Sequence, residues 1–546
     1  MPDLDADLLA ALNRPDAYPH PVAAIEHLQT HISHVFLAGD SAYKLKKPVD
    51  FGFLDFTSTE KRRRACEDEV RLNRRLAPGI YLGTVSVCRS PSGYRLAATC
   101  SATETVAETA VHMRRLPQTG LLDRLATQGR LDPALMDDIA AQLADFHARS
   151  AHGPDLARYG DLQHIRAPAI QNFEQTAPYA GRVVSVSQHA ALRAATEEFL
   201  HSHAELFAAR VRARRIVDGH GDLHLRNLCL ADGRVVIFDC IEFNPALRCG
   251  DALNDMAFLV MDLLHRQLPG HANRFLNEYL ERSHDYTGLP LLDFYLAYRA
   301  CVRAKISCFE IAQEPGMASE AARYFALAES CLNAKRGGVL VTCGVSGSGK
   351  STLARTVARE LDGVMVRSDA VRKHLAGVPL TQRGTAALYT KEMTQRTYAA
   401  LLEDARAIVA SGRWAIVDAV HARRAELEAH PLWRADRFHF IEDSGAEKAI
   451  HAAGKKAPGA LRETLFMSGI GLVTQQRLAA RARMLAVEIG AEVIHQPIPV
   501  SPAFPSFLSD MPAPVVIGPM NTDSVATAGP TRAIDVQHTT PRTTQP

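Results

Sequence analysis

In the first 110 residues, apolar positions fall in short runs separated by turn residues, as expected for a sheet. Two such runs between Val35 and Leu45 flank the turn-rich residues 38–41, which predicts a β-hairpin. Further strands are expected over residues 81–88, 94–98 and 110–116. Between the hairpin and these strands, apolar residues at helical spacing among Arg and Glu predict an amphipathic helix over residues 60–75. Residues 1–110 are therefore expected to form a small lobe built on a sheet.

From about residue 121 the pattern becomes mainly helical. One helix is predicted to open at Leu131-Asp132-Pro133 and to continue past Phe146. The helical pattern is interrupted where two apolar runs enclose the turn residues 231–234, which predicts a second hairpin. Helices resume near Asp251, and residues 111–335 are expected to form a helical lobe.

A polar, glycine-containing break over residues 335–338 precedes a third pattern. Val339 to Cys343 is an unbroken apolar run of the kind found in buried strands of parallel sheets, and two later apolar runs end at Asp369 and Asp418. We expect an α/β domain with a parallel sheet over residues 338–510. The remaining residues, 511–546, are rich in Pro, Thr, Ser and Gly, which predicts a disordered tail.

Composition narrows the choice of partners. Lys plus Arg (62) almost equal Asp plus Glu (60), which argues against nucleic acid and membrane surfaces and favours a small-molecule substrate. The ten cysteines form no C-x-x-C pair, so we expect reduced packing residues. The acidic N-terminus and the absence of an apolar stretch of about 18 residues predict a cytoplasmic protein. The oligomeric state is not predictable from these features.

Residues 220–227, with the letters HGDLHLRN, have the spacing of a phosphotransfer catalytic loop. Transfer to a hydroxyl needs a carboxylate near the attacking oxygen and Mg²⁺ ligands that align the phosphates of ATP. We expect Asp222 to be the catalytic carboxylate and Asn227 to ligate Mg²⁺. The hairpin that follows ends at Asp239, where a second Mg²⁺ ligand belongs. The alternative is a polar turn between helices.

These residues resemble the aminoglycoside phosphotransferase and choline kinase group of the protein-kinase-like fold, over roughly residues 20–335. The resemblance implies an α+β, two-lobed domain in which Lys44 binds the α- and β-phosphates of ATP. It also implies that Glu69, with Glu67 as the rival, anchors this lysine. The alternative for Lys44 is a solvent-exposed strand lysine, because Lys46 and Lys47 lie in the same stretch.

Two features depart from the pattern of this group. No G-x-G-x-x-G loop precedes the strand lysine, so residues 30–33 would have to cover the phosphates with backbone amides and the Ser33 hydroxyl. Only eleven residues separate Asp239 from Asp251, too few for the long segment with which protein kinases dock polypeptides. A small-molecule hydroxyl is therefore favoured. Asp251 and Asp255 match acidic positions of the group, and we expect them to brace the catalytic loop and cap a helix.

Residues 344–351 satisfy G-x-x-x-x-G-K-S between an apolar strand and a helix, which is the context of a P-loop. Such glycines let successive N–H groups point at phosphates, the lysine spans the β- and γ-oxygens, and the serine ligates Mg²⁺. A glycine-rich structural loop is the alternative. The residues predicted to bind nucleotide are Gly344, Ser346, Gly347, Ser348, Gly349, Lys350, Ser351 and Thr352, and Ser351 is also the predicted metal ligand.

Three further residues are expected to complete this second site. Asp418, at the end of a buried strand, is placed to reach the magnesium shell. Asp369 is expected to take the proton of an acceptor hydroxyl, and Arg372, three residues later, to hold an anionic group on the same side. For Asp369 the alternative is a helix N-cap.

From residue 339 to about 420 the chain resembles small P-loop kinases that include gluconate kinase, polynucleotide 5′-kinase and the zeta-toxin-like group. The resemblance implies an arginine-bearing lid, for which the candidates are Arg423, Arg424, Arg477, Arg481 and Arg483. Our preferred hypothesis is a bifunctional kinase that uses ATP and Mg²⁺. Two alternatives are a nucleotide-binding regulator in which only one half is catalytic and a nucleic-acid end-processing kinase.

Overall fold

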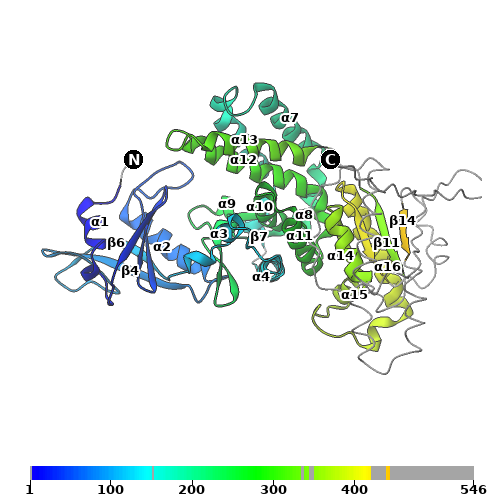
Figure 1. The fold of residues 1–546 in the computed structure, drawn as a ribbon, viewed down its shortest axis with the longest axis horizontal. Helices are drawn as coiled ribbons and strands as arrows, with labels where there is room; N and C mark the ends of the chain where they lie inside the picture. Colours follow the sequence, from blue (N-terminus) through cyan, green and yellow to red (C-terminus); the bar gives the residue numbers. More distant parts are fainter. Residues whose placement is uncertain (1–2, 151–152, 334–336, 344–349, 420–437, 443–546) are drawn as a thin grey trace, which may run out of the picture.

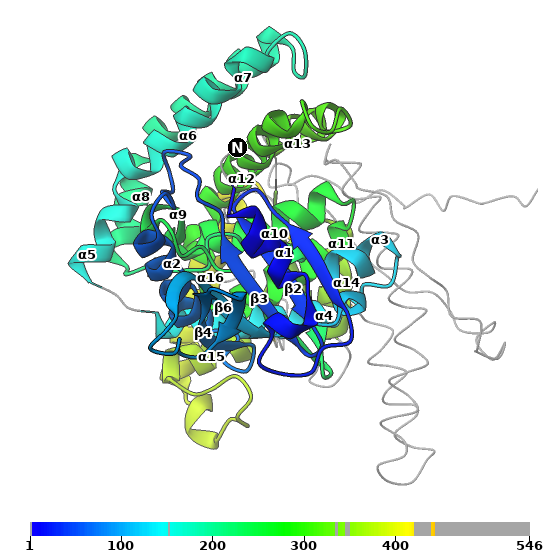
Figure 2. The same cartoon turned by 90° about the vertical axis from the view of Figure 1, so that its left-hand side faces the viewer.

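The structure is a computed structural model that describes residues 3–150, 153–333, 337–343, 350–419 and 438–442. Three parts follow one another along its longest axis, an N-terminal sheet (blue), a set of helices (green) and a second sheet with its helices (yellow) (Figure 1). Viewed from the N-terminal side, the first sheet stands in front of the helices (Figure 2). This is the two-lobed domain followed by an α/β domain that the sequence predicts.

The N-terminal lobe is a six-stranded antiparallel sheet of order β1-β2-β3-β6-β4-β5. Helix α2 (Thr59–Asn73) packs on one face, and the N-terminal helix α1 (Ala6–Leu12) lies on the other, against β5. Because side chains alternate along a strand, Tyr43 and Leu45 face α1 while Lys44 faces α2. The strands are β1 (Ile25–Gln29), β2 (Ser33–Ala38), β3 (Ser41–Lys46), β4 (Tyr81–Ser90), β5 (Gly93–Ala97) and β6 (Thr105–Arg114).

The predicted hairpin, helix and three further strands of this lobe are all present, whereas α1 and β1 were not predicted. One prediction about the cysteines is wrong, because Cys88 and Cys100 form a disulfide. Strand β5 runs back beside β4 and so brings Cys100 close to Cys88. The Cα atoms of these two cysteines are 5.4 Å apart, within the range that a disulfide requires. The other cysteines whose side chains are described are buried thiols.

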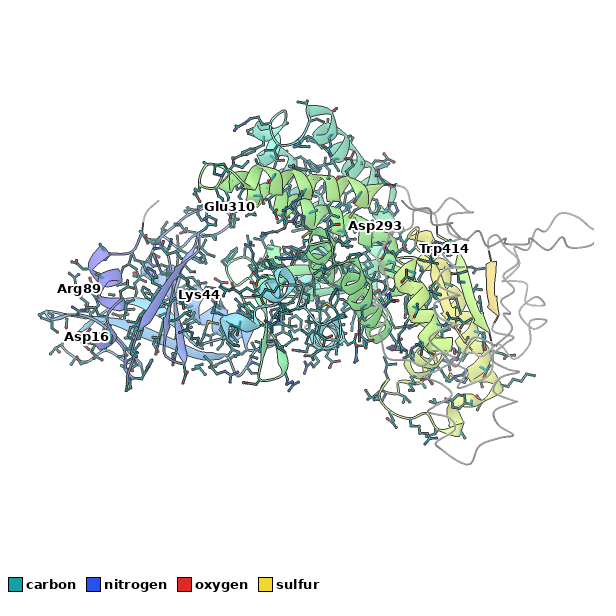
Figure 3. All side chains as sticks on the ribbon, viewed as in Figure 1. Asp16, Lys44, Arg89, Asp293, Glu310 and Trp414 are labelled. Carbon is teal, nitrogen blue, oxygen red and sulfur yellow. A yellow bond between two sulfur atoms is a disulfide. The ribbon has the colours of Figure 1, made fainter. Side chains whose placement is uncertain are left out.

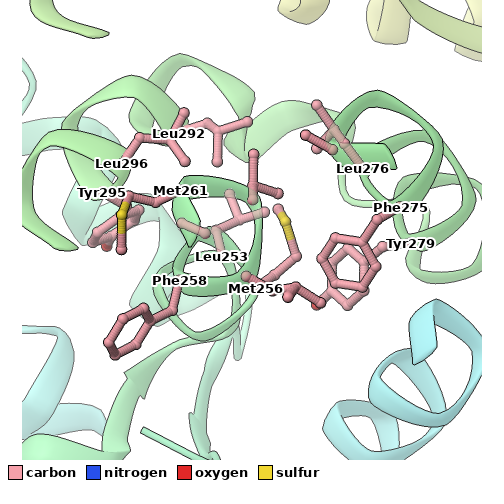
Figure 4. Close-up of a cluster of buried hydrophobic side chains, with 14 of the residues drawn as sticks. Leu253, Met256, Phe258, Met261, Phe275, Leu276, Tyr279, Leu292, Tyr295 and Leu296 are labelled. Carbon is pink, nitrogen blue, oxygen red and sulfur yellow. The ribbon is translucent and has the colours of Figure 1, made fainter. Parts of the chain in front are cut away.

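The second lobe is helical, and its core surrounds α10 (Ala252–His265), which is buried on nearly all sides. Met256, Phe258 and Met261 of this helix meet side chains from two neighbouring helices, α11 and α12 (Figure 4). The helices are α3 (Leu122–Thr127), α4 (Leu135–Arg149), α5 (Pro154–Ala157), α6 (Leu162–Thr176), α7 (Val186–Ser202), α8 (Ala204–Arg212), α9 (Pro245–Arg248), α11 (Pro269–Ser283), α12 (Leu292–Glu310) and α13 (Met317–Leu332).

Two short strand pairs flank the catalytic-loop motif of residues 220–227. Strand β7 (Ile216–Asp218) pairs with β10 (Cys249–Asp251), and the predicted second hairpin is β8 (Leu228–Ala231) with β9 (Arg234–Ile237). The catalytic-loop motif therefore lies between β7 and β8, and β9 leads directly to Asp239.

The C-terminal domain holds a parallel sheet of order β12-β13-β11-β14. In this order β13 lies next to β11, so Asp418 at the end of β13 pairs with Thr342 near the end of β11. The elements are β11 (Val339–Cys343), α14 (Lys350–Glu360), β12 (Val364–Arg367), α15 (Ser368–Ala376), α16 (Lys391–Ala410), β13 (Ala415–Asp418) and β14 (Phe438–Glu442). The predicted tail and the candidate lid arginines lie outside the described residues.

Helix α11 of the helical lobe covers β12, the edge strand of the parallel sheet. Asn277 Oδ1 accepts a hydrogen bond from Met365 N (2.6 Å), and Asn273 Nδ2 donates to Gly363 O (2.9 Å). Side chains of the helix thus pair backbone groups that an edge strand would otherwise leave open. An ion pair between Arg413 and Asp293 adds a second contact near Trp414 (Figure 3), and one apolar core runs through both domains.

At the same interface, Asp404 of α16 is a carboxylic acid in an apolar setting. Its side chain is buried, and within the described part of the chain its Oδ2 has no hydrogen-bond partner, with His284 Nε2 at 3.8 Å. Burial, reinforced by Glu403, raises the pKa of Asp404 to about 7.

We predict that Asp404→Asn stabilises the protein, and more at pH 8 than at pH 5. The folded carboxyl keeps its proton up to about pH 7, whereas the unfolded carboxyl ionises near pH 3.8, so the folded state loses stability as pH rises between these values. The gain should reach roughly 2–4 kcal/mol at pH 8. Thermal unfolding at both pH values measures it, with Glu392→Gln, an exposed carboxyl at the start of the same helix, as control. An equal gain at both pH values would contradict the assignment.

Candidate phosphotransfer sites

The catalytic-loop motif brings Asp222 and Asn227 together. Asn227 Nδ2 donates to the backbone carbonyl (2.9 Å) and to Oδ2 (3.0 Å) of Asp222, and His224 Nε2 lies 3.3 Å from the same carboxylate. Burial would raise the pKa of Asp222, but His224, Arg303 and His220 outweigh it and hold the pKa well below its usual range. Asp222 is therefore ionised at neutral pH and oriented to accept a hydrogen bond from a hydroxyl.

Asp255 of α10 fixes the backbone of this loop. Its carboxylate accepts hydrogen bonds from His220 N (2.7 Å) and Gly221 N (2.8 Å), and His147 Nε2 lies 3.0 Å from Oδ2. Gly221 has a φ of +82°, and an added Cβ would lie 2.8 Å from Leu247 O, so this position requires glycine. A rigid helix thus sets the geometry of the loop.

Other groups from the helical lobe support the same loop. Asp262, two turns further along α10, accepts from Leu225 N (2.9 Å), and Arg299 of α12 donates to Gly221 O (3.0 Å). Asp251 caps α10 by accepting from Leu253 N. The structure therefore gives Asp255 and Asp251 the bracing and capping contacts that the sequence predicts.

Lys44 stands between the two lobes (Figure 3). Its Nζ lies 2.9 Å from Glu69 Oε1 and 2.5 Å from Asp239 Oδ1. Glu69 is fully buried on α2, whereas its rival Glu67 is exposed and pairs with Arg63. The contacts thus favour Glu69 as the partner of Lys44, and the strand lysine is not solvated.

Asp239 is held in an uncommon backbone conformation at the end of the second hairpin. Its φ is +63°, a region that non-glycine residues rarely occupy and that is concentrated at functional sites. Its N–H donates to the Tyr81 hydroxyl (3.1 Å), and the next N–H, of Cys240, donates to Asn73 Oδ1 (2.8 Å). These contacts turn the carboxylate toward Lys44, and 40% of the side chain stays exposed.

Lys46 and Glu242 are two charged residues of this site that sequence reasoning missed. Lys46 Nζ lies 2.5 Å from Glu69 Oε2 and forms an ion pair with Glu242, and both side chains are buried. The sequence signal for Lys46 was the alternation of side chains along a strand, because Lys44 and Lys46 are two residues apart on β3 and must lie on the same face of the sheet. Burial and the neighbouring Glu69 raise the pKa of Glu242, against the opposing effect of Lys46.

The residues of the first site fit Mg²⁺ with a nucleotide. Mg²⁺ is usually held by one or two protein groups while phosphate oxygens and waters complete its shell. Asn227 uses Nδ2 toward Asp222, which leaves its amide oxygen as a ligand, and Asp239 supplies an exposed carboxylate. No group of three His, Cys, Asp or Glu side chains suited to a metal occurs in the described ranges.

Residues 30–33 form the turn between β1 and β2. Thr30 Oγ1 accepts from Ser33 N (3.0 Å), and the Ser33 side chain is fully buried. His31 Nε2 reaches Glu310 Oε1 of α12 at 2.9 Å, so this turn spans the two lobes (Figure 3). The predicted role of the Ser33 hydroxyl toward phosphate stays a prediction, and its buried position speaks against it.

In the second site, Asp418 meets the helix that follows the P-loop motif. Ser351 Oγ donates to Asp418 Oδ2 (2.6 Å), and Thr342 Oγ1 of β11 donates to Oδ1 (3.3 Å). The two predicted metal-associated residues of this half are therefore in direct contact. Thr352 is exposed on the first turn of α14. Gly344, Ser346, Gly347, Ser348 and Gly349 lie outside the described residues, and α14 begins at Lys350.

Asp369 and Arg372 do not share an environment. Asp369 is half-exposed and pairs with Lys373 (2.9 Å), so it stands where a solute can reach it. Arg372 is buried, and its guanidinium donates to Leu388 O (2.9 Å) and Thr394 Oγ1 (3.2 Å). These contacts give Arg372 a structural role, and its role toward a substrate anion stays a prediction that the geometry disfavours.

Each half of the chain matches the model of a known protein family. The model of the phosphotransferase enzyme family matches residues 49–295, and that of an AAA domain matches residues 339–451. The chain is 34% identical over 451 residues to the uncharacterized protein Rv2004c of Mycobacterium tuberculosis and, to the same extent, to the uncharacterized protein Mb2027c of Mycobacterium bovis. These alignments cover 80% of this chain and 88% of each relative.

Solved structures similar to the first half include two kinases. A choline/ethanolamine kinase family protein from Mesorhizobium loti is 15% identical with a TM-score of 0.36, over 58% of this chain and 89% of that one. A choline kinase from Cryptosporidium parvum is 12% identical with a TM-score of 0.35, over 56% and 88%. Because 88% of each mycobacterial relative is matched at 34% identity, the chain belongs to their family, and it joins a domain of the phosphotransferase enzyme family to a P-loop, kinase-like AAA domain.

Proposed function

We propose that the protein is a bifunctional, ATP-dependent phosphotransferase, in which each half transfers the γ-phosphoryl group to a hydroxyl of a small molecule. The observation that carries the proposal is the pairing of Asp222 with Asn227 in the loop and of Lys44 with Asp239 across the two lobes. Phosphoryl transfer depends mainly on positioning and on charge stabilisation, and these four side chains provide both.

In the first half, Asp222 orients the acceptor. Its ionised carboxylate accepts the hydroxyl hydrogen bond, so that the oxygen faces the phosphorus and its proton has a base to move to as the bond forms. Lys44 would bind phosphate oxygens, and the amide oxygen of Asn227 would hold the metal. When bound, ATP would supply the γ-phosphoryl group, whose bond to ADP breaks as the bond to the acceptor oxygen forms, and Mg²⁺ would neutralise the phosphate charge.

In the second half, we assign binding of the β- and γ-phosphates to the P-loop motif and the acceptor proton to Asp369. The contact between Ser351 and Asp418 supports this assignment, because a P-loop hydroxyl and a strand-end carboxylate together complete a magnesium shell. Asp369 is the second residue of α15, two residues after the end of β12, at the carboxyl edge of the parallel sheet where ligands of such folds bind.

The partners that we propose are small hydroxyl compounds. The even balance of charge across the chain speaks against nucleic acid. In the described residues no helix has the length and apolar character of a membrane span. We also propose a cytoplasmic location.

A regulator, in which one nucleotide site controls the other, is the second candidate. The contacts of α11 favour it, because Tyr279 of this helix bonds His147 (2.8 Å), which in turn bonds the loop-bracing Asp255. Two residues further on, Glu281 forms a bidentate ion pair with Arg367 at the end of β12. One helix thus touches the supports of both sites.

We predict that Asp222→Ala and Lys350→Ala silence different reactions. ATP consumption is measured across a panel of hydroxyl metabolites with the wild type and each variant. The bifunctional proposal expects each substitution to lower the turnover of a different acceptor by at least about 100-fold, because Asp222→Ala removes a general base and Lys350→Ala removes a cation that stabilises transition-state charge. Loss of one shared activity in both variants would favour the regulator, and retention of all activities in Asp222→Ala would refute the first site.

We predict that Asp255→Asn lowers both stability and turnover of the first half. The amide keeps the volume but loses one acceptor oxygen, which leaves a buried loop N–H unpaired at a cost of roughly 2–3 kcal/mol. Urea unfolding and acceptor phosphorylation measure the two effects, with the exposed Asp145→Asn as a matched control. Full activity in a variant with weakened stability would show that loop geometry does not depend on this carboxylate.

A further inference from the structure

We propose that Lys46 is a positioning residue of the first site. It holds Glu69 and the segment 239–242 in place, so that Lys44 can exchange the carboxylate of Asp239 for the phosphates of MgATP. The inference rests on the proposed function of the first half and deepens it, because it assigns a role to a buried cation that the phosphotransfer steps do not use.

The strand period brings Lys46 into the site. It lies two residues after Lys44 on β3, and its side chain is fully buried on the same face of the sheet. Its Nζ contacts Glu69 Oε2 (2.5 Å) and Glu242, and it lies 5.5 Å from the centre of the Phe56 ring. A buried ammonium group is costly unless it is paired, and these two carboxylates pair it.

The contacts of Glu69 show why one lysine is not enough. Glu69 offers Oε1 to Lys44 and Oε2 to Lys46, so each of its oxygens has a separate cation. When phosphates draw Lys44 away from Asp239, the ion pair between Lys44 and Glu69 changes in strength. Lys46 touches neither Asp239 nor exposed surface, so its hold on Glu69 is independent of the nucleotide. Glu69 therefore stays ionised and oriented while Lys44 changes partners.

The second contact of Lys46 steadies the metal-binding segment. Glu242 follows Asp239 by three residues, and the ion pair ties this segment to strand β3 of the N-terminal lobe. Asp239 needs such support, because its backbone is in the left-handed region. The pair acts together with the Cys240 N–H on Asn73 and the Ile241 N–H on His220 O (3.1 Å).

Lys46→Met tests this role by the binding of MgATP. All variants carry Lys350→Ala, and binding that Lys44→Met abolishes is assigned to the first site. We expect Lys46→Met to weaken this binding about 10- to 100-fold and to raise the Mg²⁺ concentration for half-saturation, as for groups that orient metal ligands. Lys47→Met is the matched control, because Lys47 is the next residue and the one hydrogen bond of its side chain in the described contacts is to the exposed Gln29 (3.3 Å).

A double variant separates positioning from stability. Lys46→Met/Glu242→Leu removes Lys46 together with Glu242, so that Glu242 is no longer a buried carboxylate without a cation, while Glu69 keeps Lys44. Its thermal midpoint should therefore recover in part from that of Lys46→Met toward that of the Lys47→Met control. Its affinity for MgATP should stay low. Recovery of both properties, or normal affinity in Lys46→Met, would overturn the role of Lys46. MgATP binding that Lys44→Met leaves unchanged would instead refute the proposed function of the first half, and the inference with it.

Discussion

The first site depends on a group of five charges, four of them buried, that crosses from the N-terminal sheet to the helical lobe. Two lysines of β3 bind three carboxylates, of which Glu69 belongs to α2 while Asp239 and Glu242 belong to the segment after β9. An unpaired buried charge costs on the order of several kcal/mol. Each charged residue of the group is therefore held in place by its partner of opposite charge. The relative placement of the lobes and the direction of the Asp239 carboxylate thus follow from the same contacts.

The helical lobe supplies the second constraint. Carboxylates of α10 accept the backbone N–H groups of the catalytic loop, and α11 pairs the edge strand of the parallel sheet. One continuous apolar core encloses both helices. The domain of the phosphotransferase enzyme family and the AAA domain are therefore built on a shared support.

Much of this arrangement was predictable from the sequence. Motif spacing predicted Asp222, Asn227, Asp239 and Asp418 as site residues, and the structure places Asp222 beside Asn227, Asp239 beside Lys44 and Asp418 beside Ser351. The choice between Glu69 and Glu67 needed coordinates, since both lie on one charged helix. The disulfide of Cys88 was missed because its partner is set by the β4–β5 hairpin. The burial of Lys46 was missed because a lysine looks solvated when its partners are distant in sequence, here by 196 residues for Glu242.

We propose that the five charged residues around Lys44 form the nucleotide-binding site of the first half. A crystal structure of the protein with Mg²⁺ and a non-hydrolysable ATP analogue tests it most directly. The account predicts that Lys44 keeps Glu69 but leaves Asp239 for phosphate oxygens, and that Asp239 and the amide oxygen of Asn227 ligate the metal. A structure at saturating analogue in which Lys44 still binds Asp239, with no nucleotide between the lobes, would contradict it.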